Sequence, residues 1–524
     1  MVMECSLRWT FAVGHEHAMG RQDFDVAIVG GGFAGSLLAM MARRRGKSVL
    51  LVERQKHPRF VMGESSTPLA NLLLEEIALR HDLPRLLPLC KWGTWQATYP
   101  SIGCGLKRGF SFYHHGPGGR PWVHDDARSR ELLVAASPSD AVADTHWYRP
   151  DFDAFLFREA ASMGAEALEE TTLEAPEFGP AGVRVTGRGP SGSFQAHARW
   201  LFDATGPRGY LHRALGLGEV NPQGYPSTEA VFGHFADVER WEAVHAPVGT
   251  VPFPPDDAAL HHVFDDGWTW ILRFNNGLTS AGFARRTVPG RVTNAGEAWA
   301  GWLRRSPDVA RCFAHAVPTR PLAHIPKLSF RTSRVSGPGW LMLPIAAGFV
   351  DPLLSMGFPL TLLGLVRIGE AWDRGGDMDM NSLGEETIRD LDAAFGMVGA
   401  LYRAMPDFDV FRDLLLFYFT AAIWSETARR LGKPGRALGF LLRGMPRFAD
   451  GMREAVACAA TGNAAQARDR VRSVVEDLDL AGMLDESRRH RHGCDAGILM
   501  ANAWRLDATP GEMQAMLARS GFAG

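Results

Sequence analysis

The alternation of apolar and polar positions near the start of the chain predicts a strand, a turn, a helix and a second strand. Residues 24–29 form a short apolar run that ends in glycines, as is typical of a buried parallel strand. Residues 36–45 begin with small and aliphatic side chains and end with arginines, which suits a helix because cations stabilise its C-terminal end. Residues 48–52 form another apolar run. The whole unit has about 30 residues, the size of a βαβ motif.

The rest of the chain alternates between helical and extended patterns. We expect helices at residues 68–80, 152–163 and 360–374, and strands at 106–115, 196–202, 268–274 and 340–345. Residues 88–106, rich in glycine, proline and aromatic side chains, indicate a loop. Residues 225–285 are predicted to be rich in β-structure, with a hairpin turn at 275–277. From residue 381 on, the chain is predicted to be mostly helical.

Composition places the chain among ordinary globular proteins. Its 524 residues exceed what one simple core holds, so two or three packed units are expected. The formal net charge of −2 gives no basic field for a polyanion and argues against a nucleic-acid partner. The six cysteines are scattered and none forms a C-x-x-C pair, a usage typical of reduced thiols in the cytoplasm.

Two segments bear on targeting and membranes. Residues 1–23 lack the charged and then apolar pattern of a signal peptide, and we expect a loose N-terminal extension. Residues 337–368 are the most apolar stretch, but Asp351 and four prolines interrupt them. A membrane span needs about 20 unbroken apolar residues. We therefore predict buried protein interior there and no membrane span.

The glycine turn after the first strand carries the strongest chemical signal. Gly30-Gly-Gly-Phe-Ala-Gly35 fits the G-x-G-x-x-G pattern of dinucleotide-binding folds, in the strand–turn–helix context that this function requires. Gly30 permits the tight turn, Gly32 lets the backbone approach a pyrophosphate, and Gly35 lets helix and strand pack closely. Glu53, at the end of the second strand, can accept the ribose hydroxyls. Further contacts are expected from Phe33, Ala34 and Arg54.

Later segments resemble those of flavoprotein monooxygenases and flavin-dependent halogenases. They are residues 61–68 (Val-Met-Gly-Glu-Ser-Ser-Thr-Pro), 147–153 (Trp-Tyr-Arg-Pro-Asp-Phe-Asp), 203–206 (Asp-Ala-Thr-Gly) and 348–357 (Gly-Phe-Val-Asp-Pro-Leu-Leu-Ser-Met-Gly). The resemblance runs from Phe24 to about Glu426 and implies that the cofactor is FAD. It also implies cofactor contacts at Glu64, Ser65, Ser66, Arg149, Asp203, Gly206, Asp351 and Gly357.

The resemblance also implies a fold and a domain organisation. We expect an α/β protein with a Rossmann-type FAD-binding domain, like that of p-hydroxybenzoate hydroxylase, a β-rich substrate domain and a C-terminal helical region. After the extension 1–23, the FAD-binding domain would cover 24–215, with residues 320–375 returning to it. Residues 216–319 would form the β-sheet substrate domain and 376–524 the helical region.

Among these flavoproteins, the Gly-Glu-Ser-Ser-Thr-Pro and Phe-Val-Asp-Pro-Leu-x-Ser-x-Gly segments are most similar to halogenases. That family uses reduced flavin and O2 to oxidise a halide to hypohalous acid, which reaches a lysine beside an electron-rich aromatic substrate. Residues 106–112 resemble the strand that carries this lysine, which implies that Lys107 is catalytic, together with Ser355. Two alternatives stay open: Lys107 is a surface lysine beside Arg108, or Lys91 takes the role because the loop before Lys107 is long.

Three departures weaken the resemblance. Trp268-Thr-Trp270 is similar to the halogenase W-x-W-x-I-P motif, which would make both tryptophans catalytic, but Leu272 and Arg273 replace the Ile and Pro. The two tryptophans could equally share one strand face and pack a core. Leu354 replaces the glutamate of tryptophan halogenases, which argues against tryptophan as the substrate.

The third departure is Pro344-Ile345, where these flavoproteins carry Gly-Asp. Ile345 cannot bond the ribityl chain, and a buried hydroxyl left unpaired costs about 1–3 kcal/mol. Asp351 could cap the following helix or sit near the flavin pyrimidine edge. The backbone N–H groups of residues 353–357 could hold a flavin oxygen or a halide. The paired histidines lack metal-ligand spacing, so no metal is expected.

The sequence therefore favours an FAD-dependent, halogenase-like oxidoreductase that uses chloride or bromide. Its substrate would be an electron-rich phenol or pyrrole, free or tethered to a carrier protein. A separate flavin reductase is expected because the sequence has one nucleotide fingerprint. We expect a cytoplasmic monomer or homodimer. The rivals are an FAD-dependent monooxygenase or dehydrogenase without halogenation, which the departures favour, and a non-catalytic FAD-binding protein.

Overall fold

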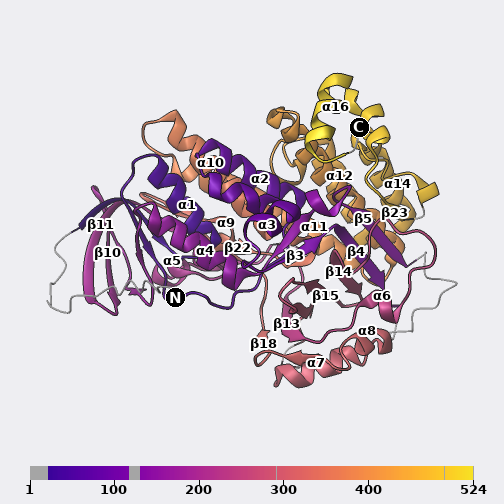
Figure 1. Cartoon of the computed structure of the whole chain (residues 1–524), viewed down its shortest axis with the longest axis horizontal. Coiled ribbons are helices and arrows are strands. Elements are labelled where there is room, and N and C mark those ends of the chain that lie inside the picture. The colour runs from indigo at the N-terminus through magenta and orange to yellow at the C-terminus, as the bar shows by residue number, and fades with distance from the viewer. Residues whose placement is uncertain are drawn as a thin grey trace, which may run out of the picture.

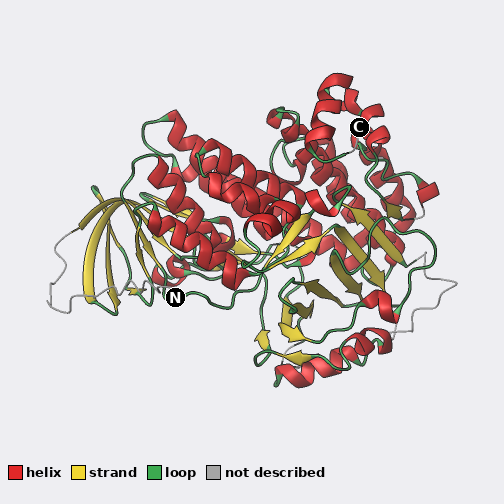
Figure 2. Ribbon diagram, in the orientation of Figure 1, coloured by secondary structure: helices red, strands yellow, loops and turns green. Residues whose placement is uncertain are grey.

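Two large sheets and the helices around them make up the computed structural model, which describes residues 22–116 and 130–522 except 223, 289, 291 and 489. The first sheet lies on the left in Figure 1, and the second lies at the lower right beneath the C-terminal helices. Figure 2 shows long helices running along the upper side of both sheets. The expected N-terminal extension lies almost wholly outside the described residues.

The first sheet contains the predicted βαβ unit. Strand β1 (Gln22–Val29) pairs in parallel with β2 (Val49–Val52) and with β11 (Gly192–Asp203). Strand β7 (Glu166–Leu168) extends the sheet beyond β2, and β21 (Trp340–Met342) extends it beyond β11. Helix α1 (Phe33–Arg44) joins β1 to β2 and packs against α4 (Arg149–Ser162) and α10 (Gly357–Arg374). Parallel strands covered by helices on this pattern form the Rossmann-type fold that the sequence predicted.

The second sheet draws its strands from three stretches of the chain. Its centre is the predicted β-rich region, with β13 (Thr228–Ala236), β14 (Ala259–Val263), β15 (Gly267–Arg273) and β16 (Thr279–Arg286). Strands β4 (Gly109–His114) and β5 (Glu131–Ala135) join beside β14, although both fall within the stretch expected to be the FAD-binding domain. The C-terminal β23 (Arg491–His492) pairs with β5 at the edge.

The C-terminal third is mostly helical, as predicted. Helices α11 (Met380–Ala404) and α12 (Phe408–Arg430) are long and largely buried. Four further α-helices follow, α13 (Pro446–Ala460), α14 (Ala464–Val475), α15 (Ala496–Ala501) and α16 (Pro510–Arg519). The α16 end of the chain lies close to α12 and β5 (Figure 1). This region therefore covers the second sheet rather than standing apart from it.

The predicted loop at residues 88–106 is wrong. The segment contains the end of the 3-10 helix η1 (Pro84–Cys90), helix α3 (Trp92–Thr98) and the start of strand β3 (Cys104–Lys107). Trp95 is fully buried, stacks on Phe152 with 5.5 Å between ring centroids, and donates a hydrogen bond to the Ile102 carbonyl at 3.0 Å. Tertiary packing of one large side chain overrides the local glycine and proline content here.

The predicted strand at residues 106–115 divides at Arg108. Strand β3 pairs with β6 (Asp144–Trp147), where Lys107 faces Asp144 in the register, whereas β4 belongs to the second sheet. Arg108 itself forms an ion pair with Asp140 at 2.6 Å. Lys107 therefore lies at the point where the chain passes into the second sheet.

Within the described part of the chain, one segment, Leu353–Arg374, is long and apolar enough to cross a membrane. In this fold 83% of its most apolar window is buried inside the protein. The segment contains α10, which packs against α1 and α2 (Pro68–Arg80). It is therefore accounted for as a core helix.

The close approach of α1 to β1 gives a test of the fold. A Cβ atom added at Gly35 would lie 1.9 Å from the Gly30 carbonyl oxygen. We expect Gly35→Ala to lower the free energy of unfolding by about 1–3 kcal/mol, measured by urea denaturation. Gly396→Ala, in an exposed part of α11 where an added Cβ atom meets nothing within 4 Å, should raise it by roughly 0.5–1 kcal/mol. Equal effects at both positions would contradict this packing.

Candidate cofactor cleft and buried lysine

The glycine turn between β1 and α1 has the geometry of a phosphate-binding loop. Gly30 has φ +107°, and a Cβ atom there would lie 2.6 Å from the Ala204 backbone. Gly32 precedes α1 and supplies no side-chain cap, so the first N–H groups of the helix can bind an anion. The guanidinium groups of Arg59 and Arg149 lie 3.3 Å and 3.6 Å from where a Gly32 Cβ atom would be. Two arginines, the Asp153 carboxylate that pairs with both of them, and the free N–H groups of α1 thus meet at one point.

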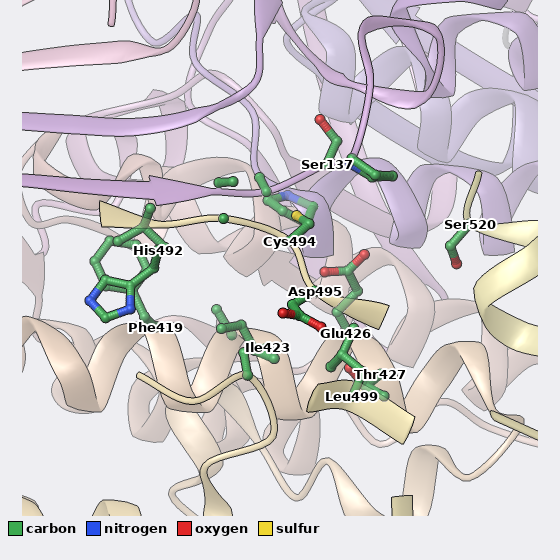
Figure 3. A pocket seen from close by; sticks show the side chains of 18 of the residues that line it. Ser137, Phe419, Ile423, Glu426, Thr427, His492, Cys494, Asp495, Leu499 and Ser520 are labelled. Atoms are coloured by element: carbon green, nitrogen blue, oxygen red, sulfur yellow. The ribbon is translucent and has the colours of Figure 1, made fainter. Parts of the chain in front are cut away.

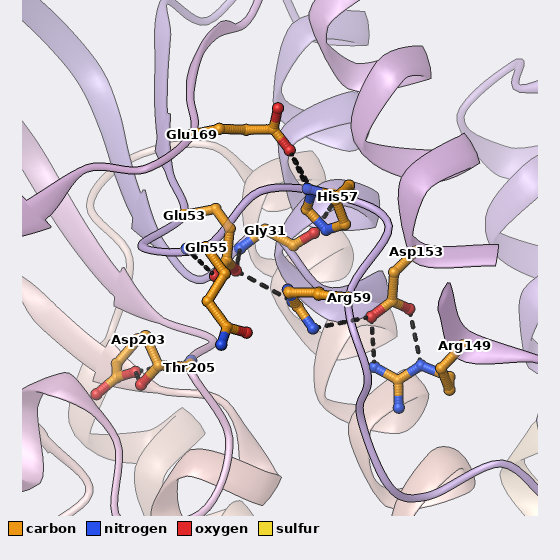
Figure 4. A network of polar contacts seen from close by, with 11 residues as sticks. Gly31, Glu53, Gln55, His57, Arg59, Arg149, Asp153, Glu169, Asp203 and Thr205 are labelled. Carbon is orange, nitrogen blue, oxygen red and sulfur yellow. Dashed lines mark hydrogen bonds and ion pairs between the residues drawn. The ribbon is translucent and has the colours of Figure 1, made fainter. Parts of the chain in front are cut away.

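Glu53 organises the end of β2, as Figure 4 shows. Its Oε2 atom accepts hydrogen bonds from the Gly31 N–H at 2.9 Å and from Arg59 Nη2 at 3.0 Å. Its Oε1 atom accepts one from the Gln55 N–H at 2.9 Å. The carboxylate is buried beside the glycine turn, the position that ribose recognition requires.

Arg149 at the start of α4 is fixed by a bidentate pair with Asp153 (Figure 4). Its Nε and Nη2 atoms lie 2.7 Å and 2.8 Å from the two carboxylate oxygens. Nη1 donates to the Gly63 carbonyl at 2.9 Å, and the guanidinium lies 5.0 Å from the centroid of the Phe33 ring. Such a fork is well ordered before any ligand binds.

These groups line a cleft of about 500 Å³. Its lining includes eight of the predicted cofactor residues, namely Gly30, Gly32, Phe33, Ala34, Glu53, Arg54, Arg149 and Gly206. It also includes Tyr210 and Arg213, which carried no motif that sequence analysis could use. The free helix N-terminus, the glycine cradle and the ribose-position carboxylate together fit a flavin dinucleotide.

Ile345, which replaces the family's aspartate, lines this cleft, and its place beside the ribityl chain stays a prediction. Its side chain offers no hydrogen-bonding atom, so the cleft is apolar at that point. Thr361 of α10 lines the same cleft, but its hydroxyl already donates to the Gly357 carbonyl at 2.9 Å.

Asp203 holds the turn that follows β11 at the edge of the cleft. One carboxylate oxygen accepts from the Thr205 N–H and hydroxyl at 2.9 Å and 2.6 Å, and the other accepts from the Leu211 N–H at 2.6 Å. Burial raises the pKa of Asp203, and these hydrogen bonds oppose the rise. The residue thus holds the turn that presents Gly206, while its own contact with the cofactor stays a prediction.

In the Gly-Glu-Ser-Ser segment, Glu64, Ser65 and Ser66 do not line the cleft, and the two serines contact the lysine. Glu64 accepts a hydrogen bond from His234 Nε2 at 2.8 Å, with both side chains buried. The Ser65 hydroxyl and the Ser66 carbonyl both accept from Lys107. Direct cofactor contacts by Glu64, Ser65 and Ser66 stay predictions.

Lys107 is fully buried, so the alternative of a surface lysine is wrong. Its Nζ atom donates to Ser65 Oγ at 2.9 Å and to the Ser66 carbonyl, and lies 4.0 Å from the centroid of the Phe110 ring. Burial lowers the pKa of Lys107, and the negative charge of Asp144 opposes that effect. The rival Lys91 is only half-buried at the start of α3.

The loop before α10 is strained and tightly held. Leu354 and Ser355 have φ values of +68° and +55°, a conformation that side chains with a Cβ atom rarely adopt. Asp351 accepts hydrogen bonds from the Leu353 N–H at 3.0 Å, from Trp268 Nε1 at 3.2 Å and from the Tyr402 hydroxyl at 2.9 Å. Asp351 thus holds the Leu353 N–H within this loop but does not cap α10, which begins at Gly357 without a side-chain cap, and its place near the flavin stays a prediction. Backbone strain of this kind gathers at functional sites.

The two tryptophans of the weakened motif share one face of β15, with 5.5 Å between their ring centroids. Both are buried in the main core, as the packing alternative predicted. Trp268 bonds Asp351, whereas Trp270 donates to the Ser280 hydroxyl at 3.3 Å. Catalytic roles for Trp268, Trp270 and Ser355 stay predictions.

A second cavity of about 130 Å³ lies beside Phe110. Figure 3 shows it between α12, which carries Phe419 and Glu426, and the C-terminal segment that carries Cys494 and Asp495. The lining is mainly apolar and aromatic, and Asp144 contributes to it from β6. Tyr418 also lines it and donates a hydrogen bond to the Leu354 carbonyl at 2.8 Å. Two lining residues therefore connect the cavity to its surroundings. Phe110 contacts Lys107, and Tyr418 bonds Leu354.

The paired histidines His114 and His115 are buried and form hydrogen bonds within the core. His114 bonds the Met405 carbonyl at 2.8 Å, and His115 bonds His262 at 3.0 Å. Across the described ranges no group of three or more His, Cys, Asp and Glu side chains could hold a metal ion.

Comparison with known proteins places this architecture. The family described as FAD-dependent oxidoreductase matches residues 25–350. The chain belongs to this family. Its relatives include the tetracycline 7-halogenase of Kitasatospora aureofaciens, 31% identical, with 65% of this chain and 62% of that protein covered. They also include monodechloroaminopyrrolnitrin halogenase PrnC of Pseudomonas fluorescens, 29% identical, with 64% and 59% covered. The chain thus spans about three fifths of the length of these relatives.

Solved structures agree. The halogenase PltM, crystallised with phloroglucinol and FAD, superimposes with a TM-score of 0.79 at 23% identity, covering 89% of this chain and 99% of that one. The predicted fold class and the resemblance to flavin-dependent halogenases are confirmed.

Removal of Glu53 tests the cleft. We expect Glu53→Ala to raise the dissociation constant of FAD about tenfold or more, because a charge-assisted hydrogen-bond acceptor is lost beside the glycine turn. Fluorescence titration of the apoprotein with FAD measures this, with Glu385→Ala, on the exposed face of α11, as the matched control. An unchanged dissociation constant would show that Glu53 only supports the loop.

Asp351 gives a prediction about pH. Burial raises its pKa to about 7, whereas an unfolded chain has about 3.9. The folded protein therefore keeps a proton that the unfolded chain has lost, and the wild type loses stability as pH rises through this window. Asp351→Asn cannot ionise, so its stability relative to wild type should improve between about pH 4 and about pH 7 in urea unfolding. A constant difference would contradict this, and Asp379→Asn at the exposed cap of α11 is the control.

Proposed function

We propose that this chain is a flavin-dependent halogenase that acts on a single-ring, electron-rich aromatic compound in small-molecule biosynthesis. The observation that carries the proposal is the fully buried Lys107 beside a mainly apolar, ring-sized cavity. A lysine without water around it favours its neutral form, whose lone pair and N–H groups can hold an electrophilic halogen.

Reduced FAD bound in the cleft would donate two electrons to O2, so that one oxygen atom leaves as water and the other converts a halide to hypohalous acid. The residues of this chain then confine and direct that oxidant. Ser65 and Ser66 fix the Nζ atom of Lys107. Phe110 contacts this amine and also lines the cavity. Exclusion of water by the surrounding core keeps the halogen from being lost to solvent.

The size of the cavity supports a small substrate. A cavity of about 150 Å³ lined by apolar side chains accepts a benzene molecule, and this cavity is about 130 Å³. We infer that the substrate is a phenol or a pyrrole, as a free compound or on a carrier protein. The proposal includes chloride or bromide as the halide, a separate flavin reductase, and a cytoplasmic monomer or homodimer.

The test is mass spectrometry of products. The purified protein is incubated with FAD, a generic flavin reductase, NADH and bromide, together with panels of phenols, pyrroles and indoles. A bromine isotope doublet in a phenol or pyrrole product is expected. An oxygenated or dehydrogenated product without bromine would overturn halogenation in favour of the monooxygenase or dehydrogenase alternative.

Mutation of Lys107 distinguishes the role of this lysine from that of the flavin. Lys107→Ala should lower the rate of product formation by roughly 10²–10⁴-fold while oxygen consumption by reduced flavin continues. Lys91→Ala is the matched control. Lys91 precedes Lys107 by 16 residues, is only half-buried, and its loss should leave the wild-type rate unchanged. Normal halogenation by Lys107→Ala would show that the site is placed wrongly.

A further inference from the structure

Asp144 is a buried acid in the wall of the ring-sized cavity. It is 6% exposed and lies on β6 beside Phe110 and Tyr418 in the lining. Its Oδ1 atom accepts a hydrogen bond from Asn71 Nδ2 at 3.0 Å. Its Oδ2 atom is buried and has no hydrogen-bond partner among the described residues. A buried carboxylate oxygen is costly in that state unless a bound molecule supplies the missing donor.

The other charged and titratable groups near Asp144 are engaged or neutral. Lys107 faces Asp144 in the β3–β6 register, but its hydrogen bonds go to Ser65 and Ser66. Glu426 pairs with Arg430 at 2.8 Å along α12. Burial raises the pKa of the Cys494 thiol to about 12, so that group stays protonated. Asp144 therefore lines the cavity and keeps one carboxylate oxygen without a hydrogen-bond partner among the described residues.

We propose that Asp144 is the general base that takes the hydroxyl proton of a phenol bound in this cavity. The inference rests on the proposed function for the identity of the electrophile, but not for the binding of the phenol. The geometry places the acceptor in the same cavity wall as the aromatic side chains that would flank the ring. Leu354 offers no acid where tryptophan halogenases carry a glutamate, and Asp144 supplies one from another strand.

The proton and electron balance is simple. The phenol O–H bond breaks and its proton moves to Asp144 Oδ2, which leaves a phenolate. A ring carbon of the phenolate attacks the halogen, and the halogen–oxygen bond of hypohalous acid breaks to release hydroxide. The ring C–H proton joins that hydroxide to form water, and Asp144 returns its proton to the phenolate oxygen. The net change converts a phenol and hypohalous acid into a halophenol and water.

The environment of Asp144 suits this role. Burial and the charge of Glu426 raise the pKa of Asp144, while Lys107, Arg430 and the Asn71 hydrogen bond lower it. A raised pKa brings the carboxylate closer to the acidity of a phenol, which ionises near about 10. The cationic side chain of Arg430, which also lines the cavity, favours a phenolate over a neutral phenol nearby.

The first experiment compares wild type with Asp144→Asn on ring-fluorinated phenols whose hydroxyl pKa falls from about 10 to below the assay pH. We expect the variant to lose about 100-fold or more in kcat on the weakly acidic phenols and to recover on those that ionise unaided. Recovery also shows that the variant is folded. Asp140→Asn, an exposed aspartate four residues earlier in the chain, is the matched control and should match wild type throughout.

An equal loss on every phenol would overturn the proposal, because it would mean that Asp144 acts only as a counterion of Lys107. Should Asp144→Asn fail to bind FAD, Asp144→Glu keeps a carboxylate at the site. That variant should stay within about tenfold of wild type on the weakly acidic phenols. Loss of those activities, with normal turnover of the acidic phenols, would also overturn the proposal.

A binding measurement separates this proposal from the proposed function. Calorimetric titration of the wild-type holoprotein should show phenol binding about tenfold tighter than its methyl ether, which has no proton to donate. Asp144→Ala should remove that preference. A preference that persists in Asp144→Ala overturns the proposal. A preference that depends on Asp144, in a protein that forms no halogenated product, would keep the binding site and reject halogenation.

Discussion

Burial of one primary amine is the constraint on which the rest of the site depends. An isolated ammonium cannot leave water without a very large cost, so a buried lysine must be neutral or closely partnered. Lys107 takes its partners from three places: the serine segment before α2, the aromatic side chain of Phe110 on β4, and Asp144 on β6. The crossing of the chain from β3 into the second sheet brings these places together.

The cofactor cleft and the smaller cavity differ in chemistry, and Lys107 lines neither of them. The cofactor cleft is built on the first sheet and is rich in cations and free N–H groups, whereas the smaller cavity is mainly aromatic and is closed by α12 and the C-terminal segment. The strained turn at Leu354 and Ser355 is tied to β15 through Asp351 and Trp268, and to α12 through the Leu354 carbonyl and Tyr418.

The parts that the sequence predicted are those set by local rules. The βαβ unit follows from apolar periodicity and glycines, and Glu53 follows from its place at the end of the second strand. Lys107 emerged only from the resemblance to a family. Helix α3 was missed because its stability comes from Trp95 packing on Phe152, and Asp144 carried no motif because its significance arises from strand pairing and C-terminal segments over 300 residues away.

The most direct test of the proposal that Lys107 serves a substrate cavity distinct from the flavin cleft is a crystal structure of the FAD complex with a bound bromophenol. Anomalous scattering from bromine locates the ligand without interpretation of weak density. The account predicts the bromine signal within the cavity lined by Phe110, Asp144 and Tyr418, with FAD in the cleft at Glu53 and Arg149. Bromine in the cleft itself, or on the surface with the cavity empty, would contradict it.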